Sequence, residues 1–252
     1  MSEKCASNSN MSKKLTFILL GLFVVFFFYN GFFDFSSNGL NSVYLTVSTF
    51  LFSVLNGFFI SRQSSRYSEI RNNLSRFDAD MTIVYRESSH LEKEEHDHVG
   101  HIIREHYEML LKKKDWTYYF THKSNLIASL HAYIQVCGDV GMDKIRGESM
   151  RKMMGTLDDA QIVRKVLVSL REETIPRLQQ IFIYVLAVIL FLAVLTLPSK
   201  DLVLASLLKS VYMMTIVMVV ILLKKFDDLT LFEGTIGEHS AKDVIRIIDG
   251  EK

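Results

Sequence analysis

The sequence predicts an all-α membrane protein with four transmembrane helices and a long helical cytoplasmic insert between spans two and three. Two observations carry this prediction. Four apolar runs contain no Asp, Glu or Arg, and each is close to the roughly 20 residues that a helix needs to cross a bilayer core. A long polar stretch separates the second run from the third, and its only Pro is Pro176, its last residue. Apolar residues recur in that stretch at helical spacing.

These runs divide the chain into five parts. In chain order, the predicted parts are a cytoplasmic N-terminal tail (1–14), a first transmembrane hairpin (15–60, with spans 15–33 and 40–60), a cytoplasmic helical region (61–176), a second transmembrane hairpin (177–223, with spans 181–197 and 202–223) and a cytoplasmic C-terminal tail (224–252). Within the helical region, the segment that starts at Arg62 continues span two directly. Its predicted core stripe is Ile70, Leu74, Phe77, Met81 and Val84.

Basic residues indicate the orientation in the membrane. Lys and Arg are enriched on the cytoplasmic side of transmembrane helices. Basic residues stand before span one, after span two and after span four, whereas the loop 34–39 has none and the loop between spans three and four has only Lys200. We therefore expect a multi-pass protein of the cell membrane with both termini in the cytoplasm.

The segment from His90 to His106 is rich in histidine. On a helix, one face would carry four possible ligands of a divalent metal: Glu94, His98, His101 and Glu105. Charge-rich helix faces are usually solvated, and a pH-sensing role is a third interpretation because His titrates near neutral pH. No second helix offers partner ligands, so we expect no bound metal and no other cofactor.

Span two carries a continuous polar stripe. Its members recur every three or four residues, which places them on one helix face: Ser42, Thr46, Thr49, Ser53 and Asn56. The apolar Ile60 follows on the same face. Two interpretations stay open. Small polar residues pack helices together in membranes, but they also suit the wall of a water-filled pore, in which an apolar ring at Ile60 could gate by dewetting.

Three basic residues near this stripe could attract anions. Arg62 and Arg66 follow Ile60 on the cytoplasmic side, and positive charge at a pore mouth favours anions. Lys209 lies inside span four, about 10 Å from its outer end at a rise of 1.5 Å per residue. Its side chain could snorkel to the membrane interface or line a polar cavity that attracts anions.

Short motifs spread through the chain resemble the bestrophin-like membrane proteins. The helix after span two is rich in Arg and Tyr and reaches Tyr85 and Arg86, and the next helix carries Tyr107 before Trp116. The entry to span three (RLQQIFIYVLAV) and the tail (DDLTLFEG) are similar to the family as well. Leu231 replaces the Pro of the family's tail, and few acidic residues remain there, so control by calcium is not supported.

By analogy with the bestrophins, the resemblance implies a homopentamer in which span two lines a central anion pore. The expected partners are then other copies of the chain, the lipid bilayer and small inorganic ions, and no nucleic acid. The alternative is a non-conducting membrane scaffold or sensor whose cytoplasmic helices bind a partner. An enzyme ranks third, because the chain has no Gly-rich phosphate loop, Cys-x-x-Cys or nucleophile elbow.

The orientation can be tested with single cysteines. We predict that an impermeant thiol reagent labels Ser37→Cys in intact cells and leaves Thr117→Cys unlabelled, when each is placed in a background without Cys5 and Cys137. Permeabilised cells, in which both positions should react, provide the control for reactivity. Labelling of position 117 alone in intact cells would reverse the predicted topology.

Overall fold

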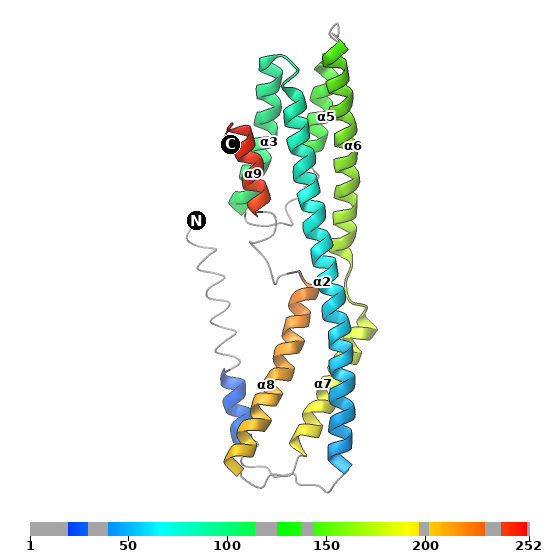
Figure 1. Ribbon diagram of the computed structural model, residues 1–252. Helices are drawn as coiled ribbons and strands as arrows, with labels where there is room; N and C mark the ends of the chain where they lie inside the picture. The colour runs from blue at the N-terminus through cyan, green and yellow to red at the C-terminus, as the bar shows by residue number, and fades with distance from the viewer. Residues whose placement is uncertain are drawn as a thin grey trace. The chain divides into compact units, whose positions relative to one another are not determined.

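The computed structural model describes residues 20–29, 40–113, 125–137, 144–196, 202–229 and 238–250, and all regular structure in these ranges is helical (Figure 1). The chain separates into two compact units. Unit 1 comprises Met1–Arg62 and Ile175–Asp227, and unit 2 comprises Gln63–Thr174 and Asp228–Lys252. Helix α2 (Leu40–Ser88) contributes its first part to unit 1 and its second part to unit 2.

Unit 1 contains the apolar helices. α7 (Arg177–Leu195) and α8 (Leu202–Asp227) pack against each other. A buried cluster joins them to the first part of α2, with Phe52 from α2, Leu190 from α7 and Ile216 from α8. Many of the large side chains that α7 and α8 leave exposed are apolar. Soluble proteins rarely expose so large an apolar surface, which is what lipid contact requires.

Three helical stretches in the described residues are long and apolar enough to cross a membrane: Val43–Ser88, Lys144–Leu195 and Val203–Asp227. They cover most of the predicted spans two, three and four. Of the first predicted span, 15–33, the structure describes only the shorter apolar helix Leu20–Tyr29. The Phe26 ring on this helix lies 5.5 Å from the Phe191 ring of α7, measured between centroids. The fourth crossing therefore stays a prediction.

Unit 2 is a bundle built around the second part of α2. Its other helices are α3 (Lys93–Lys113), α5 (Asn125–Cys137), α6 (Lys144–Glu172) and α9 (Glu238–Ile248). The whole stripe that the sequence predicted on α2, Ile70 to Val84, is buried. The contacts of α2 with α6 are antiparallel, because Lys152 Nζ lies 2.6 Å from Glu87 Oε1 while Arg66 Nε donates to Leu170 O at 2.7 Å.

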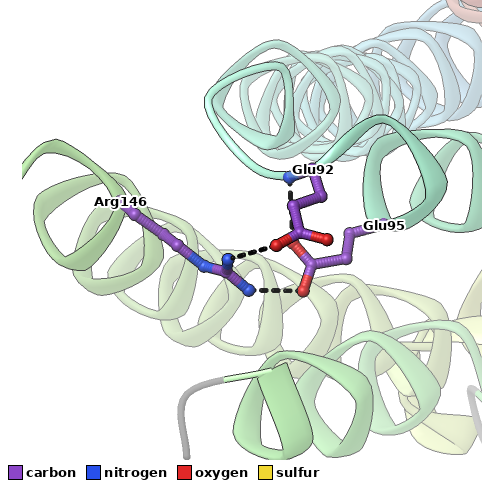
Figure 2. Close-up of polar contacts among 3 residues, drawn as sticks. All are labelled: Glu92, Glu95 and Arg146. Atoms are coloured by element: carbon purple, nitrogen blue, oxygen red, sulfur yellow. Dashed lines mark hydrogen bonds and ion pairs between the residues drawn. The ribbon is translucent and has the colours of Figure 1, made fainter. Parts of the chain in front are cut away.

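The turn between α2 and α3 is fixed by Arg146 of α6 (Figure 2). The Glu92 N–H donates to Glu95 Oε2 at 3.0 Å, which is one half of a helix capping box. The Arg146 guanidinium donates to the other oxygen of Glu95 at 2.5 Å and to Glu92 Oε1 at 3.2 Å. One guanidinium therefore binds both acids at the start of α3.

The C-terminal helix α9 packs on α3. Its Ala241 and Val244 are buried, and Tyr85 Oη donates to the Ile248 carbonyl at 3.2 Å. A Cβ added to Gly100 of α3 would lie 3.0 Å from the Tyr85 ring. Glycine is therefore the residue that fits beneath this contact without displacing the tyrosine.

A carboxylate from α8 fixes the entry to α7. Pro176 occupies the N-cap of α7 and makes no side-chain cap bond. Asp227 Oδ1 instead accepts the N–H of Ile175 at 2.7 Å, and Asp227 Oδ2 accepts Gln180 Nε2 at 3.0 Å. Negative charge is favourable at a helix N-terminus, so Asp227 stabilises the start of α7 from the end of the neighbouring helix.

This contact predicts a stability difference between two adjacent acids. Asp227→Ala leaves the buried Ile175 N–H without its acceptor, so we expect unit 1 to lose about 1–3 kcal/mol of stability. Thermal unfolding of the detergent-solubilised protein measures the loss. Asp228→Ala is the matched control, because Asp228 is exposed, and equal effects of the two substitutions would contradict the assignment.

Candidate functional site

The polar stripe of span two divides into two edges in the structure. Thr46 and Ser53 lie on the exposed face of α2, and we call them the outer edge. Thr49 is half-buried and Asn56 is buried in unit 1, and we call them the inner edge. Ser42 belongs to α2, but its side chain lies outside the part of the chain that the structure describes. A stripe that is continuous in sequence thus faces two different environments.

The inner edge makes contacts within the chain. The hydroxyls of Thr49 and Tyr212 of α8 lie 2.9 Å apart. Asn56 has an exposed fraction of 5%, and its Nδ2 donates to the Phe52 carbonyl at 2.7 Å. The Asn56 Oδ1 atom is buried without a hydrogen-bond partner among the described residues. The packing interpretation therefore explains Thr49, while half of the Asn56 amide has a hydrogen-bonding capacity that these contacts leave unused.

Ile60 ends the stripe at the core of unit 1. It is half-buried and packs against a cluster formed by Phe59 of α2, Ile175, Ile183 of α7 and Leu223 of α8. The side chain is thus anchored on one side and partly open on the other. This position is compatible with an apolar constriction, and the pore role of the stripe and of Ile60 stays a prediction.

Lys209 is enclosed by unit 1. Its exposed fraction is 7%, and Ser206 and Ser210 of the same helix are buried beside it. Ser210 Oγ donates to the Ser206 carbonyl at 2.7 Å. An intramembrane lysine usually faces the interior of a bundle or a water-filled cavity. Its burial places Lys209 on the inner side of unit 1, and a role in attracting anions stays a prediction.

The two arginines after Ile60 differ in their surroundings. Arg62 is exposed, whereas Arg66 has an exposed fraction of 5%. The Arg66 guanidinium donates to the carbonyls of Leu170 and Arg171 at 2.7 and 2.8 Å and to Gln63 Oε1 at 3.1 Å. The last carbonyls of a helix lack intrahelical partners and favour a cation. Arg66 therefore caps the C-terminus of α6, a role that the sequence analysis missed.

The histidines of α3 have separate environments. His96 Nδ1 lies 2.7 Å from Ser88 Oγ, and the His98 ring lies 4.4 Å from the Tyr133 ring of α5, measured between centroids. Burial lowers the pKa of His106 to about 4. Across the ranges that the structure describes, no three His, Cys, Asp or Glu side chains come together as a metal site.

A family model, the Bestrophin-like domain, matches residues 15–236. The chain belongs to the bestrophin-like family. The match confirms the resemblance that the short motifs indicated, and together with the apolar helices it supports an all-helical membrane protein. In this bestrophin-like chain the match ends just before α9, so the docked C-terminal helix lies beyond the family domain. Comparison with curated proteins and with solved structures found no match.

The capping role of Arg66 can be separated from a role in attracting ions. Arg66→Ala removes a buried guanidinium from the end of α6, so we expect the local stability of this helix end to fall by about 2–3 kcal/mol. Arg62→Ala removes an exposed charge and should change stability by no more than about 0.5 kcal/mol. Hydrogen exchange of the last turn of α6 measures both effects. Equal exchange in the two variants would show that Arg66 does not stabilise that turn.

Proposed function

We propose that this chain is the subunit of an oligomeric bestrophin-like ion channel, permeable to anions, in which α2 lines the pore. Membership of the bestrophin-like family supports a channel-type membrane protein. The observation that supports the assignment of α2 is the exposure of the outer edge of its polar stripe. Among the described residues, no other helix buries these side chains. The alternative function is a non-conducting scaffold or sensor.

The outer edge sits on an otherwise apolar surface. Thr46 and Ser53 share the exposed face of α2 with Gly57, whose missing Cβ would meet nothing within 4 Å. Phe50 and Val54, on the same side of the helix, are exposed and apolar. Polar side chains facing lipid are unfavourable. In a ring of several copies, the outer edge would no longer face lipid. The apolar side chains would pack between subunits, and the hydroxyls of Thr46 and Ser53 would face water.

The charges near this surface favour anions. Span two contains no acidic residue, and Arg62 is exposed two residues after Ile60. Arg66 is buried at the end of α6 whereas Arg62 is exposed, so Arg62 is the better candidate for attracting ions at this mouth. Lys209 is a further basic side chain, buried inside unit 1. Fixed positive charge raises the local concentration of anions and repels cations, so we expect chloride to permeate in preference to sodium.

Ile60 would close this path as an apolar collar. Water leaves a narrow apolar ring easily, so such a ring can block ions without steric contact. Its half-buried position lets it project beyond the core cluster while Phe59 anchors the same turn of α2. A smaller side chain at this position would widen the ring and allow it to fill with water.

Purified protein in planar bilayers tests these assignments. We expect an anion current in the wild type, a larger conductance in Ile60→Ala and a smaller one in Ser53→Leu, which extends the apolar zone along the outer edge. Val54→Leu is the matched control, because Val54 is the exposed apolar neighbour of Ser53, and its conductance should stay close to that of the wild type.

The scaffold alternative makes a different prediction in the same experiment. If wild type and Ile60→Ala are both silent while the oligomer remains intact by size, the channel proposal is wrong. Asn56→Leu would then change the stability of unit 1, in which Asn56 is buried, and not a current.

A further inference from the structure

Helices α2 and α6 of unit 2 place two acids opposite each other. The pair is antiparallel, because Glu87 contacts Lys152 while Arg66 contacts Leu170. Asp80 lies two helical turns before Glu87 on α2, and Asp159 lies two helical turns after Lys152 on α6. In antiparallel helices these two displacements point in the same direction, so Asp80 and Asp159 face each other across the contact. Next to an ion pair of opposite charges lies a pair of like charges.

Asp80 is the buried member of this pair. Its exposed fraction is 8%, and its Oδ2 atom has no hydrogen-bond partner among the described residues. Asp78, also buried on α2, differs because its Oδ1 accepts the hydroxyl of Tyr107 from α3 at 2.6 Å. An ionised carboxylate that is buried without such donors opposes folding. The ionised form of Asp80 is therefore unfavourable in the packed helix pair.

The charged groups that act on Asp80 come from both helices. Burial raises the pKa of the Asp80 carboxyl, Arg76 on the same helix lowers it, and Asp159 on α6 raises it again. The net direction is upward from the ordinary value of 3.8. The positive charge of Arg76 thus compensates only part of the burial and of the like charge across the contact.

We propose that Asp80 and Asp159 form an acid-sensitive contact between α2 and α6, which loosens when Asp80 is ionised and closes when Asp80 takes up a proton. Protonation removes one of two facing negative charges and makes the Asp80 carboxyl a hydrogen-bond donor. The contact between Asp80 and Asp159 is then tighter in acid than at neutral pH. The inference stands on the contacts of unit 2 alone and does not depend on whether the chain conducts ions.

The direction of the pH effect follows from proton linkage. Because the folded chain binds the Asp80 proton more tightly than the unfolded chain, the destabilisation is complete at pH values above the raised pKa. It decreases as the pH falls through that pKa and is absent below 3.8. His106 acts in the opposite direction, because its lowered pKa makes unit 2 lose stability as the pH falls from 6.5 to about 4. Comparing variants at each pH cancels the contribution of His106.

Hydrogen exchange of α6 in the full-length protein in detergent tests the proposal. Protection factors correct for the intrinsic pH dependence of exchange and report local opening. At neutral pH we expect Asp80→Asn to be protected about threefold or more above the wild type around Leu157 to Val163, and the difference should shrink as the pH falls. Asp159→Asn should give a smaller gain in the same direction. Asp158 and Asp159 are both exposed, but Asp158 is not among the charges that act on Asp80, so Asp158→Asn should match the wild type at every pH.

Several results would overturn the proposal. Asp80→Asn is expected to stabilise the contact, so a variant that fails to fold, or that is less protected than the wild type at neutral pH, contradicts it. A difference in protection between Asp80→Asn and the wild type that stays the same from neutral to acid pH also contradicts it. Protection at neutral pH that Mg²⁺ restores in the wild type but not in Asp80→Asn would replace the proton-sensitive contact with a cation site.

Discussion

The structure depends on how its helix ends find hydrogen-bond partners. The first N–H groups and the last carbonyls of every helix have no partner inside that helix, and in this chain side chains from other helices supply several of them. Arg66 of α2 binds the last carbonyls of α6, and Asp227 of α8 binds the N–H just before α7. At the start of α3, Glu95 caps the helix and Arg146 of α6 binds the cap. In each case one charged side chain both completes a helix and attaches it to a neighbour.

The two units satisfy opposite requirements with the same kind of helix. Unit 1 leaves apolar side chains exposed on α7 and α8 and encloses polar ones such as Lys209 and Asn56. Unit 2 buries an apolar stripe of α2 and leaves most charged residues exposed. Each unit also contains buried polar atoms that hydrogen bonds among the described residues do not satisfy, among them Asn56 Oδ1 in unit 1 and Asp80 Oδ2 in unit 2. Such groups reduce stability, and both proposals concern a helix segment that contains one of them.

The proposed channel and the proposed acid-sensitive contact depend on different physical properties of α2. Conduction depends on whether water stays next to the outer edge of α2 and on whether Ile60 expels it, which is a question of polarity and radius. The contact between Asp80 and Asp159 depends on the free energy of holding a charge in a packed interface. Both lie on α2, but each can be tested without the other, because the outer edge belongs to unit 1 and Asp80 to unit 2.

The helical class, the apolar runs and the core face of the second part of α2 could be predicted from the amino-acid sequence, because they follow from hydrophobic periodicity along a single helix. The stripe from Ile70 to Val84 is buried as that periodicity predicted, and the family was recognisable from short motifs. Only the tertiary structure decided how the polar stripe of span two divides and that Arg66 differs from Arg62. Spacing along one helix places residues on a common face. It does not show which of them contact another helix, because Tyr212 and the end of α6 lie more than 100 residues away in the chain. For the same reason the single sequence could not show that Asp80 faces Asp159, since the antiparallel register of α2 and α6 is set by side-chain packing between them.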